Sequence, residues 1–209
     1  MMNRGLFQDG IFFIRQFYGK VIRAFSPKPH PSGDLRLHLG CGAIDYPGFV
    51  NIDGIDYRHV HYVQSLTKLT RFKDASVTFI YSSHTLEHFP RSQTVSILQE
   101  WCRVLIPGGK LCVSVPDFDC ILDIYHGCGD DANFILPPLF GGQDYPFNFH
   151  HTTFNKKSLT LTLKNAGFSQ VDSWVHGSDK LHSLPDWSGR TIQVNGQPMP
   201  ISLNLEATK

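Results

Sequence analysis

The residues whose types and spacing indicate chemistry begin with Leu39, Gly40, Cys41 and Gly42, at the end of an alternating apolar run. They continue at Asp53, where a second apolar run ends. A strand that ends on two glycines lets a ligand approach the backbone where a Cβ atom would collide with it. An aspartate at the tip of the next strand accepts hydrogen bonds from ribose hydroxyls. Together they indicate a nucleoside pocket, with a tight turn and a capping aspartate as the structural alternatives.

Other polar residues follow later apolar runs. Ser82, Ser83 and His84 end one strongly apolar stretch, and Asp117 follows the next. The carboxyl ends of parallel strands meet at one edge of a sheet, so these side chains are expected beside the same pocket. Cys41 is expected there as a small side chain that fits rather than as a reactive thiol.

A general base is expected from a histidine pair or from an aspartate. His150 and His151 follow a long loop that is rich in glycine, proline and aromatic residues. Histidine titrates near neutrality and suits proton removal. The order of preference is His151, then His150, then Asp117. The alternative for the pair is a loop held together by imidazole hydrogen bonds, and Gln143 is a candidate for binding a polar acceptor.

Composition excludes several classes of protein. The chain has 209 residues with a formal net charge of +1, which gives no support to a nucleic-acid partner. It has 41% hydrophobic and 18% charged residues, as soluble globular proteins do. Its five cysteines contain no CxxC pair, so we expect a reducing compartment, no disulfide framework and no metal site.

Four segments together resemble a known motif series. They are LHLGCG, NID, YSSHTLEHF (81–89) and EWCRVLIPGGKLCVSVPDF (100–118). The series is similar to that of class I S-adenosylmethionine-dependent methyltransferases, in particular small predicted methyltransferases found among bacterial surface-polysaccharide genes. Those also have a GGQ segment followed by a histidine-containing stretch. In this chain the corresponding segments are Gly141-Gly142-Gln143 and Phe149-His150-His151.

The resemblance implies a cofactor and a reaction. The cofactor would be S-adenosylmethionine, held by Leu39, Gly40, Cys41, Gly42, Asp53, Ser82, Ser83 and His84. The reaction would be O-methylation of a small-molecule acceptor, a sugar or nucleotide sugar. The alternatives are a catalytically inactive cofactor-binding module and an N-methyltransferase on a small molecule. A nicotinamide-dependent oxidoreductase is disfavoured because its fingerprint needs a third glycine.

The elements that must position these residues alternate between strand and helix. Strands are expected at 35–39, 49–52, 61–66, 77–82, 110–115, 171–175 and 201–205, and helices at 92–105, 117–125 and 156–165. This predicts an α/β, Rossmann-like, doubly wound, mostly parallel sheet of about seven strands with an antiparallel edge and helices on both faces. The stretch between Gly42 and Asp53 is too short for a usual crossover helix, which we expect to be shortened or missing.

The start of the chain differs from the rest. Residues 11–25 have apolar side chains at helical spacing with interleaved basic residues, and a proline-rich linker follows. The expected division is residues 1–34 as an amphipathic helix with its linker and residues 35–209 as the methyltransferase domain. The helix is too charged to span a bilayer, so we expect a cytoplasmic protein whose helix packs on its own domain, touches a membrane surface or dimerises.

Overall fold

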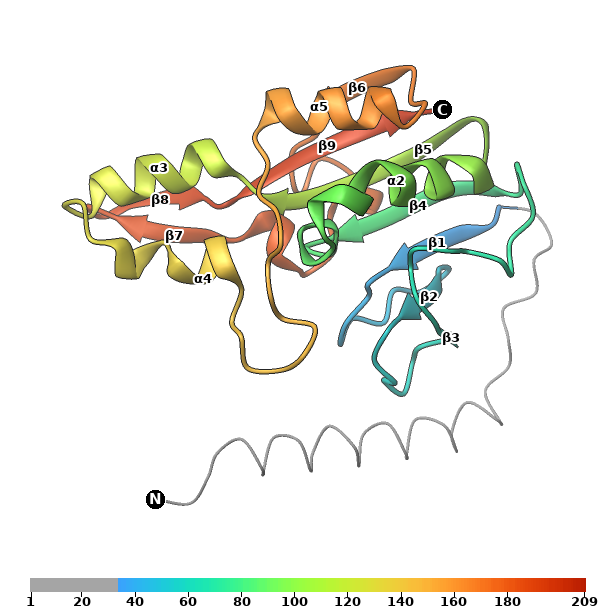
Figure 1. Ribbon diagram of the computed structural model, residues 1–209, viewed down its shortest axis with the longest axis horizontal. Coiled ribbons are helices and arrows are strands. Elements are labelled where there is room, and N and C mark those ends of the chain that lie inside the picture. Colours follow the sequence, from blue (N-terminus) through green and yellow to red (C-terminus); the bar gives the residue numbers. More distant parts are fainter. Residues whose placement is uncertain (1–33) are drawn as a thin grey trace.

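The computed structural model describes residues 34–209, which are built on one seven-stranded sheet in the order β3-β2-β1-β4-β5-β9-β6 (Figure 1). The strands of this sheet are β1 (Arg36–Leu39), β2 (Val50–Asp53), β3 (Tyr62–Val63), β4 (Val77–Ser83), β5 (Leu105–Pro116), β6 (Gln170–Ser173) and β9 (Ser202–Thr208). The first five are parallel, and β9 runs antiparallel to both β5 and β6. The predicted mostly parallel sheet with an antiparallel edge is confirmed.

Four helices and five 3-10 turns accompany the sheet within residues 34–209. The helices are α2 (Thr94–Val104), α3 (Phe118–Gly127), α4 (Leu136–Phe140) and α5 (Lys156–Asn165). The turns are η1 (Leu86–His88), η2 (Arg91–Gln93), η3 (Ala132–Phe134), η4 (Lys180–His182) and η5 (Trp187–Gly189). Between β1 and β2 the chain forms only turns, so the missing first crossover helix is also confirmed.

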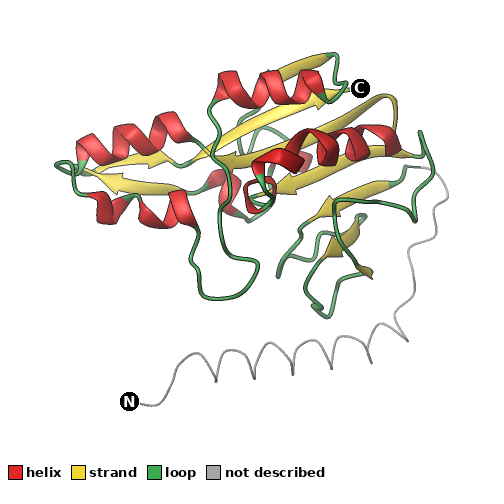
Figure 2. Cartoon of the chain, in the orientation of Figure 1, coloured by secondary structure: helices red, strands yellow, loops and turns green. Residues whose placement is uncertain are grey.

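One face of the sheet is covered by helices. Trp101 of α2 and Leu159 of α5 are buried against strand residues such as Leu37 and Val113. Figure 2 shows α2 and α5 over this face. The start of α5 follows from its local sequence, because Asn155 and Ser158 form a reciprocal capping box there.

The other face differs from the expectation of helices on both sides. Phe79, Tyr81 and Cys112 are covered there by Phe49, which precedes β2, and by Trp174, which follows β6. Among the described residues no α-helix contributes to this buried cluster. Right-handed crossovers from β1 to β2 and from β2 to β3 would place helices on this face, and both connections are short loops here.

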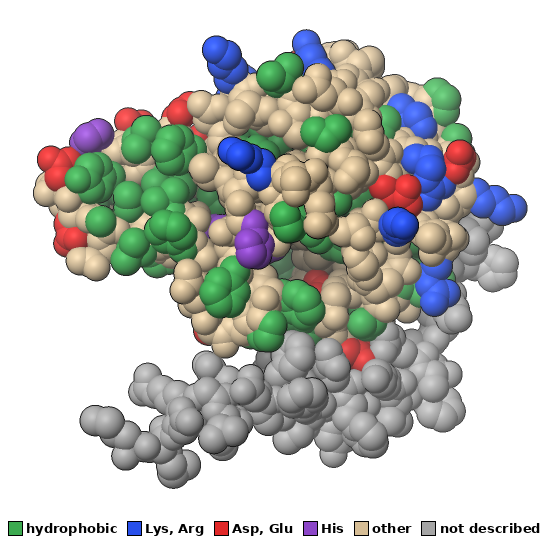
Figure 3. All heavy atoms as spheres, in the orientation of Figure 1, with side chains coloured by type: hydrophobic (Ala, Val, Ile, Leu, Met, Phe, Trp, Pro, Cys, Tyr) green, Lys and Arg blue, Asp and Glu red, His purple; other side chains and the backbone are tan. Residues whose placement is uncertain are grey.

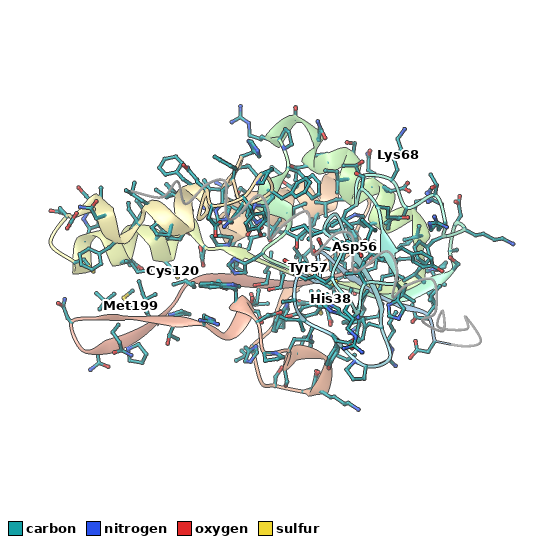
Figure 4. All side chains as sticks on the ribbon, turned by 90° about the horizontal axis from the view of Figure 1, so that it is seen from below. His38, Asp56, Tyr57, Lys68, Cys120 and Met199 are labelled. Atoms are coloured by element: carbon teal, nitrogen blue, oxygen red, sulfur yellow. The ribbon has the colours of Figure 1, made fainter. Side chains whose placement is uncertain are left out.

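A small extension projects beyond the carboxyl ends of the strands. It combines α3, α4 and the hairpin β7 (Thr191–Val194) and β8 (Gln197–Pro200), and it encloses its own buried cluster of Ile124, Val194 and Ile201. Figure 4 shows Cys120 and Met199 in this extension, well away from His38 and Tyr57. Apolar side chains gather over α3 and α4 in Figure 3, where Phe134 and Phe140 are exposed.

Several sequence boundaries were wrong. The long loop expected before His150 contains η3 and α4. β5 begins five residues before the predicted strand because Leu105 pairs with Val77. The β7–β8 hairpin was missed although Asn195-Gly196, both at positive φ, is a typical two-residue hairpin turn. The predicted N-terminal helix lies outside the described residues, so the division near residue 34 stays a prediction. No helix between residues 34 and 209 has the length and apolar character to cross a bilayer.

Candidate functional site

The loop after β1 is shaped by a close approach from the segment that follows β4. Gly40 has φ +69°, and a Cβ atom there would lie 2.1 Å from the Thr85 hydroxyl oxygen. Its N–H donates to the carbonyl oxygen of Ile52 at 2.8 Å. Gly42 has φ +53°, and a Cβ atom added to it would have no neighbour within 4 Å, so its α-carbon borders open space. Only glycine satisfies both the conformation and the contact at position 40.

The carboxylate of Asp53 joins this loop to the end of β2. Its Oδ2 accepts from the N–H of Gly42 at 2.8 Å, and its Oδ1 accepts from the N–H of Ile55 at 2.7 Å. Burial raises the pKa of Asp53, against the lowering effect of these hydrogen bonds. Each carboxylate oxygen retains a second lone pair for a ligand hydroxyl. The glycine loop and Asp53 therefore converge, as the sequence predicted.

A cavity of about 1140 Å³ opens at this edge of the sheet. Most of the predicted site residues line it: Gly40, Cys41, Gly42, Asp53, Ser83, His84, His150 and His151. Its volume lies slightly above the range typical of small-molecule sites, which is about 300–1,000 Å³. It accommodates a nucleoside and a second small molecule together.

Other predicted site residues lie outside the cavity lining. The Leu39 side chain is buried in the core, and its carbonyl oxygen accepts from the Ser82 hydroxyl at 3.1 Å. Asp117 caps α3, because its carboxylate accepts from the N–H of Asp119. Gln143 also lies outside the lining. These side chains belong to neighbouring elements rather than to the cavity surface.

The Cys41 thiol has no sign of activation. Its side chain is buried, and burial raises the pKa of the thiol far above its usual range. A thiol is nucleophilic only as the thiolate. The geometry thus agrees with the expected role of Cys41 as a small side chain that fits.

The long loop before α5 is fastened over η1. The N–H of His151 donates to the carbonyl oxygen of Glu87 at 2.8 Å, and His88 Nδ1 lies 3.1 Å from the carbonyl oxygen of Phe149. The N–H of His150 donates to the carbonyl oxygen of Phe140. His150 and His151 are therefore carried onto the cavity wall, and His88 anchors the loop.

Glu87 is the most unusual charged residue of the site, and the sequence analysis missed it. Its carboxylate is fully buried and lies 3.3 Å from His84 Nδ1 and 3.9 Å from His150 Nε2. Burial raises the pKa of Glu87, but His84, His88 and His150 outweigh it and leave the pKa below its usual value. Burial lowers the pKa of His150. The sequence Leu86-Glu87-His88 was the one local sign of Glu87's role. The contact with His150 could not be predicted, because it depends on how the long loop folds back.

A second group that the sequence missed comes from the segment before β7. Trp187 and Arg190 line the cavity, and the Arg190 guanidinium lies 4.6 Å from the centre of the Trp187 ring. The ring of His84 lies 6.0 Å from that of Trp187. Tyr145, from the long loop, also lines the cavity, and burial raises its pKa to about 12. Together these side chains offer an aromatic face, a cation and a hydroxyl donor.

Comparison with known proteins agrees with this architecture. Residues 44–113 match a family model described as a methyltransferase domain. No curated protein matches the chain.

Solved structures share the fold along most of the chain. A SAM-dependent methyltransferase from Archaeoglobus fulgidus has 14% identity and a TM-score of 0.51, covering 93% of this chain and 94% of that one. One from Mesorhizobium loti has 18% identity and a TM-score of 0.51, covering 91% and 96%. The 1,6-didemethyltoxoflavin-N1-methyltransferase of Burkholderia thailandensis has 15% identity and a TM-score of 0.55, covering 93% and 77%. At these identities the similarity establishes the fold.

The predicted fold is thus confirmed, and the family match supports the predicted enzyme class and cofactor. The chain has the fold of solved S-adenosylmethionine-dependent methyltransferases, and residues 44–113 within it match the model of a methyltransferase domain.

Proposed function

We propose that this protein transfers the methyl group of S-adenosylmethionine to a hydroxyl of a sugar or nucleotide sugar. The observation that carries the proposal is the junction of Gly42 and Asp53 on the cavity lining, at 2.8 Å. Backbone and carboxylate meet where a nucleoside binds in open α/β sheets, beyond the carboxyl ends of the strands.

The cofactor would lie across the ends of β1 and β2. Asp53 would accept hydrogen bonds from the ribose, and Gln64 and Leu66, which line the cavity after β3, would face the base. Ser83 and His84 would border the methionine part. A sulfonium cofactor carries no phosphate, so the absent crossover helix removes no phosphate-binding helix N-terminus that it needs.

The acceptor would enter from the side of the histidines and Trp187. The flat ring of Trp187 suits the apolar C–H face of a sugar, and Arg190 suits a phosphate or ring hydroxyl. The preference for a sugar comes from these two side chains together with the sequence resemblance. The net charge of +1 favours a small-molecule acceptor over nucleic acid. We propose that the protein acts in the cytoplasm.

His151 is the proposed base. Its side chain is exposed on the cavity lining, and no hydrogen bond within the described residues occupies its imidazole. Bound S-adenosylmethionine would supply the methyl group, with its carbon–sulfur bond breaking as the acceptor oxygen–carbon bond forms, and the His151 imidazole would accept the hydroxyl proton. The protein's main task is to align acceptor and methyl group and to exclude water. His150 is the alternative base, and Asp117, as the cap of α3, is the least suited.

The test is transfer of labelled methyl groups to a panel of nucleoside-diphosphate hexoses, with product analysis for a methyl ether. Label on a sugar hydroxyl supports the proposal. Cofactor binding without transfer to any acceptor would leave an inert cofactor-binding module, and transfer only to amines would leave an N-methyltransferase. Trp187→Ala should raise the acceptor KM about fivefold, from a loss of about 1 kcal/mol of ring contact, with cofactor affinity unchanged.

A further inference from the structure

Glu87 lies in η1, shortly after the end of β4, with its side chain turned into the protein. The residue is 0% exposed, and neither carboxylate oxygen has a hydrogen-bond partner among the described residues. A buried carboxylate without donors is costly, because the charge has lost its hydration. Either a proton on the neighbouring imidazoles or a bound cation must therefore neutralise Glu87.

Three imidazoles surround this carboxylate. One ligand-type atom from each of Glu87, His88 and His150 lies within 4.8 Å of the others. His84 lies outside this group, but its Nδ1 is 3.3 Å from Glu87 Oε1. The histidines come from the end of β4, from η1 and from the long loop, and all three line the cavity. Glu87 lies behind them.

In His88 and His150, the Nδ1 atom already donates a hydrogen bond to a backbone carbonyl. His88 Nδ1 faces the carbonyl oxygen of Phe149 at 3.1 Å, and His150 Nδ1 faces that of Pro138 at 2.9 Å. A carbonyl oxygen only accepts, so both Nδ1 atoms carry a proton. In the neutral rings the Nε2 atoms then carry lone pairs.

The third imidazole leads to the same result. The Ser202 hydroxyl donates its one proton to the carbonyl oxygen of Trp187 at 2.8 Å, so it accepts from His84 Nε2 at 2.8 Å. Neutral His84 therefore presents the lone pair of Nδ1 to Glu87. The cluster therefore combines three nitrogen lone pairs with one carboxylate. When all three imidazoles are neutral, none of them donates a hydrogen bond to Glu87.

We propose that Glu87, His88 and His150 bind a divalent transition-metal ion at the wall of the cavity, with His84 as a further ligand. Imidazole and carboxylate ligands suit Zn²⁺, Co²⁺, Mn²⁺ and Fe²⁺. Histidine ligands characteristically donate their other N–H to a carbonyl or similar acceptor, as all three do here. Ligands of tetrahedral zinc lie about 3.4 Å apart, so separations within 4.8 Å close by small side-chain movements.

A second cluster shows what distinguishes this one. Cys112, His182 and Glu206 also lie within 4.8 Å of one another. Their charges already have partners, because His182 Nδ1 lies 2.7 Å from Asp179 and Glu206 lies 2.6 Å from Lys110. We expect no metal there, which makes Glu206 a matched control. In the proposed methyltransferase, the bound ion could hold the acceptor hydroxyl. The metal site itself does not depend on that function.

The test measures metal binding without any turnover. Untagged full-length protein is treated with chelator, dialysed, and titrated with Zn²⁺ by calorimetry and with Co²⁺ by visible absorption. Wild type should bind one equivalent of each, with a Co²⁺ spectrum of nitrogen and oxygen ligation. Glu87→Gln should weaken binding at least ~100-fold, while Glu206→Gln should bind as wild type does.

Circular dichroism is recorded for each variant, and His88→Gln, on a half-buried side chain, serves as the second ligand variant if Glu87→Gln unfolds. Absence of one-to-one binding to wild type, or equal affinity in the folded ligand variants, would overturn the metal site. Either result would leave the methyltransferase proposal standing, since labelled methyl transfer is measured separately.

Discussion

The two walls of the cavity are built in opposite ways. The wall proposed to bind the nucleoside, called the nucleoside wall below, is formed by Gly40–Gly42 and Asp53–Ile55. It joins two neighbouring strands through backbone N–H groups and one carboxylate. The histidine wall, formed by His84, His88, His150, His151 and Trp187, is assembled from three segments far apart in the chain. The first is fixed by backbone geometry, and the second presents side chains.

This difference indicates which wall should control cofactor binding and which should control turnover and acceptor binding. Cofactor affinity should depend on the nucleoside wall, whereas turnover and acceptor affinity should depend on the histidine wall. Substitutions on the two walls should therefore separate in their effects on cofactor Kd, kcat and acceptor KM. A variant that moved all three together would break the distinction.

The largest expected effect is on stability at the nucleoside wall. Gly40→Ala places a Cβ atom 2.1 Å from Thr85 at a positive φ, so the free energy of unfolding should fall by about 3 kcal/mol from strain and overpacking. Gly108→Ala is the control, because Gly108 also has positive φ but nothing within 4 Å. It should lose only about 1 kcal/mol in urea unfolding. Equal losses would show that the contact with Thr85 does not matter.

The next effect is on turnover at the histidine wall. His151→Ala should lower kcat at least ~100-fold through loss of the base, with cofactor affinity unchanged. His126→Ala, at an exposed histidine of α3 outside the cavity, is the control and should keep wild-type kcat. Near-normal turnover of His151→Ala would transfer the role to His150, whose imidazole also lines the cavity.

A smaller effect concerns acid stability beneath the nucleoside wall. Burial lowers the pKa of His38, on β1, to about 4, against the raising influence of Asp186. The unfolded chain takes up this proton near pH 6.5 and the folded chain only near pH 4, so stability is full above pH 6.5 and falls as the pH drops between these values.

From pH 7 to pH 5 this group should remove about 2 kcal/mol from the free energy of unfolding. The measurement is the loss of stability over this range in wild type minus the loss in His38→Gln. No difference between the two would mean that His38 takes up its proton equally in both states.

The sequence predicted what depends on local pattern. The strand ends at Gly40 and Asp53 follow from apolar runs that break on particular residues, and the start of α5 follows from its capping box at Asn155. The β7–β8 hairpin was also predictable from Asn195-Gly196. It was missed because the whole stretch between the predicted strands 171–175 and 201–205 was interpreted as a loop.

The histidine wall was not predictable in the same way. Glu87 becomes unusual only when the long loop folds back and places His150 beside it. Trp187 and Arg190 reach the cavity from the connection between β6 and β7, which no local periodicity assigns to the site. Contacts between segments far apart in the chain decide this wall, and single-sequence patterns do not contain them.

The most direct test of the nucleoside wall is calorimetric titration of the full chain with S-adenosylhomocysteine and with NAD. Wild type should bind S-adenosylhomocysteine but not NAD, and Asp53→Ala should weaken that binding by about 1–3 kcal/mol through loss of charge-assisted hydrogen bonds. Unchanged affinity in folded Asp53→Ala, or binding of NAD in place of S-adenosylhomocysteine, would contradict the account.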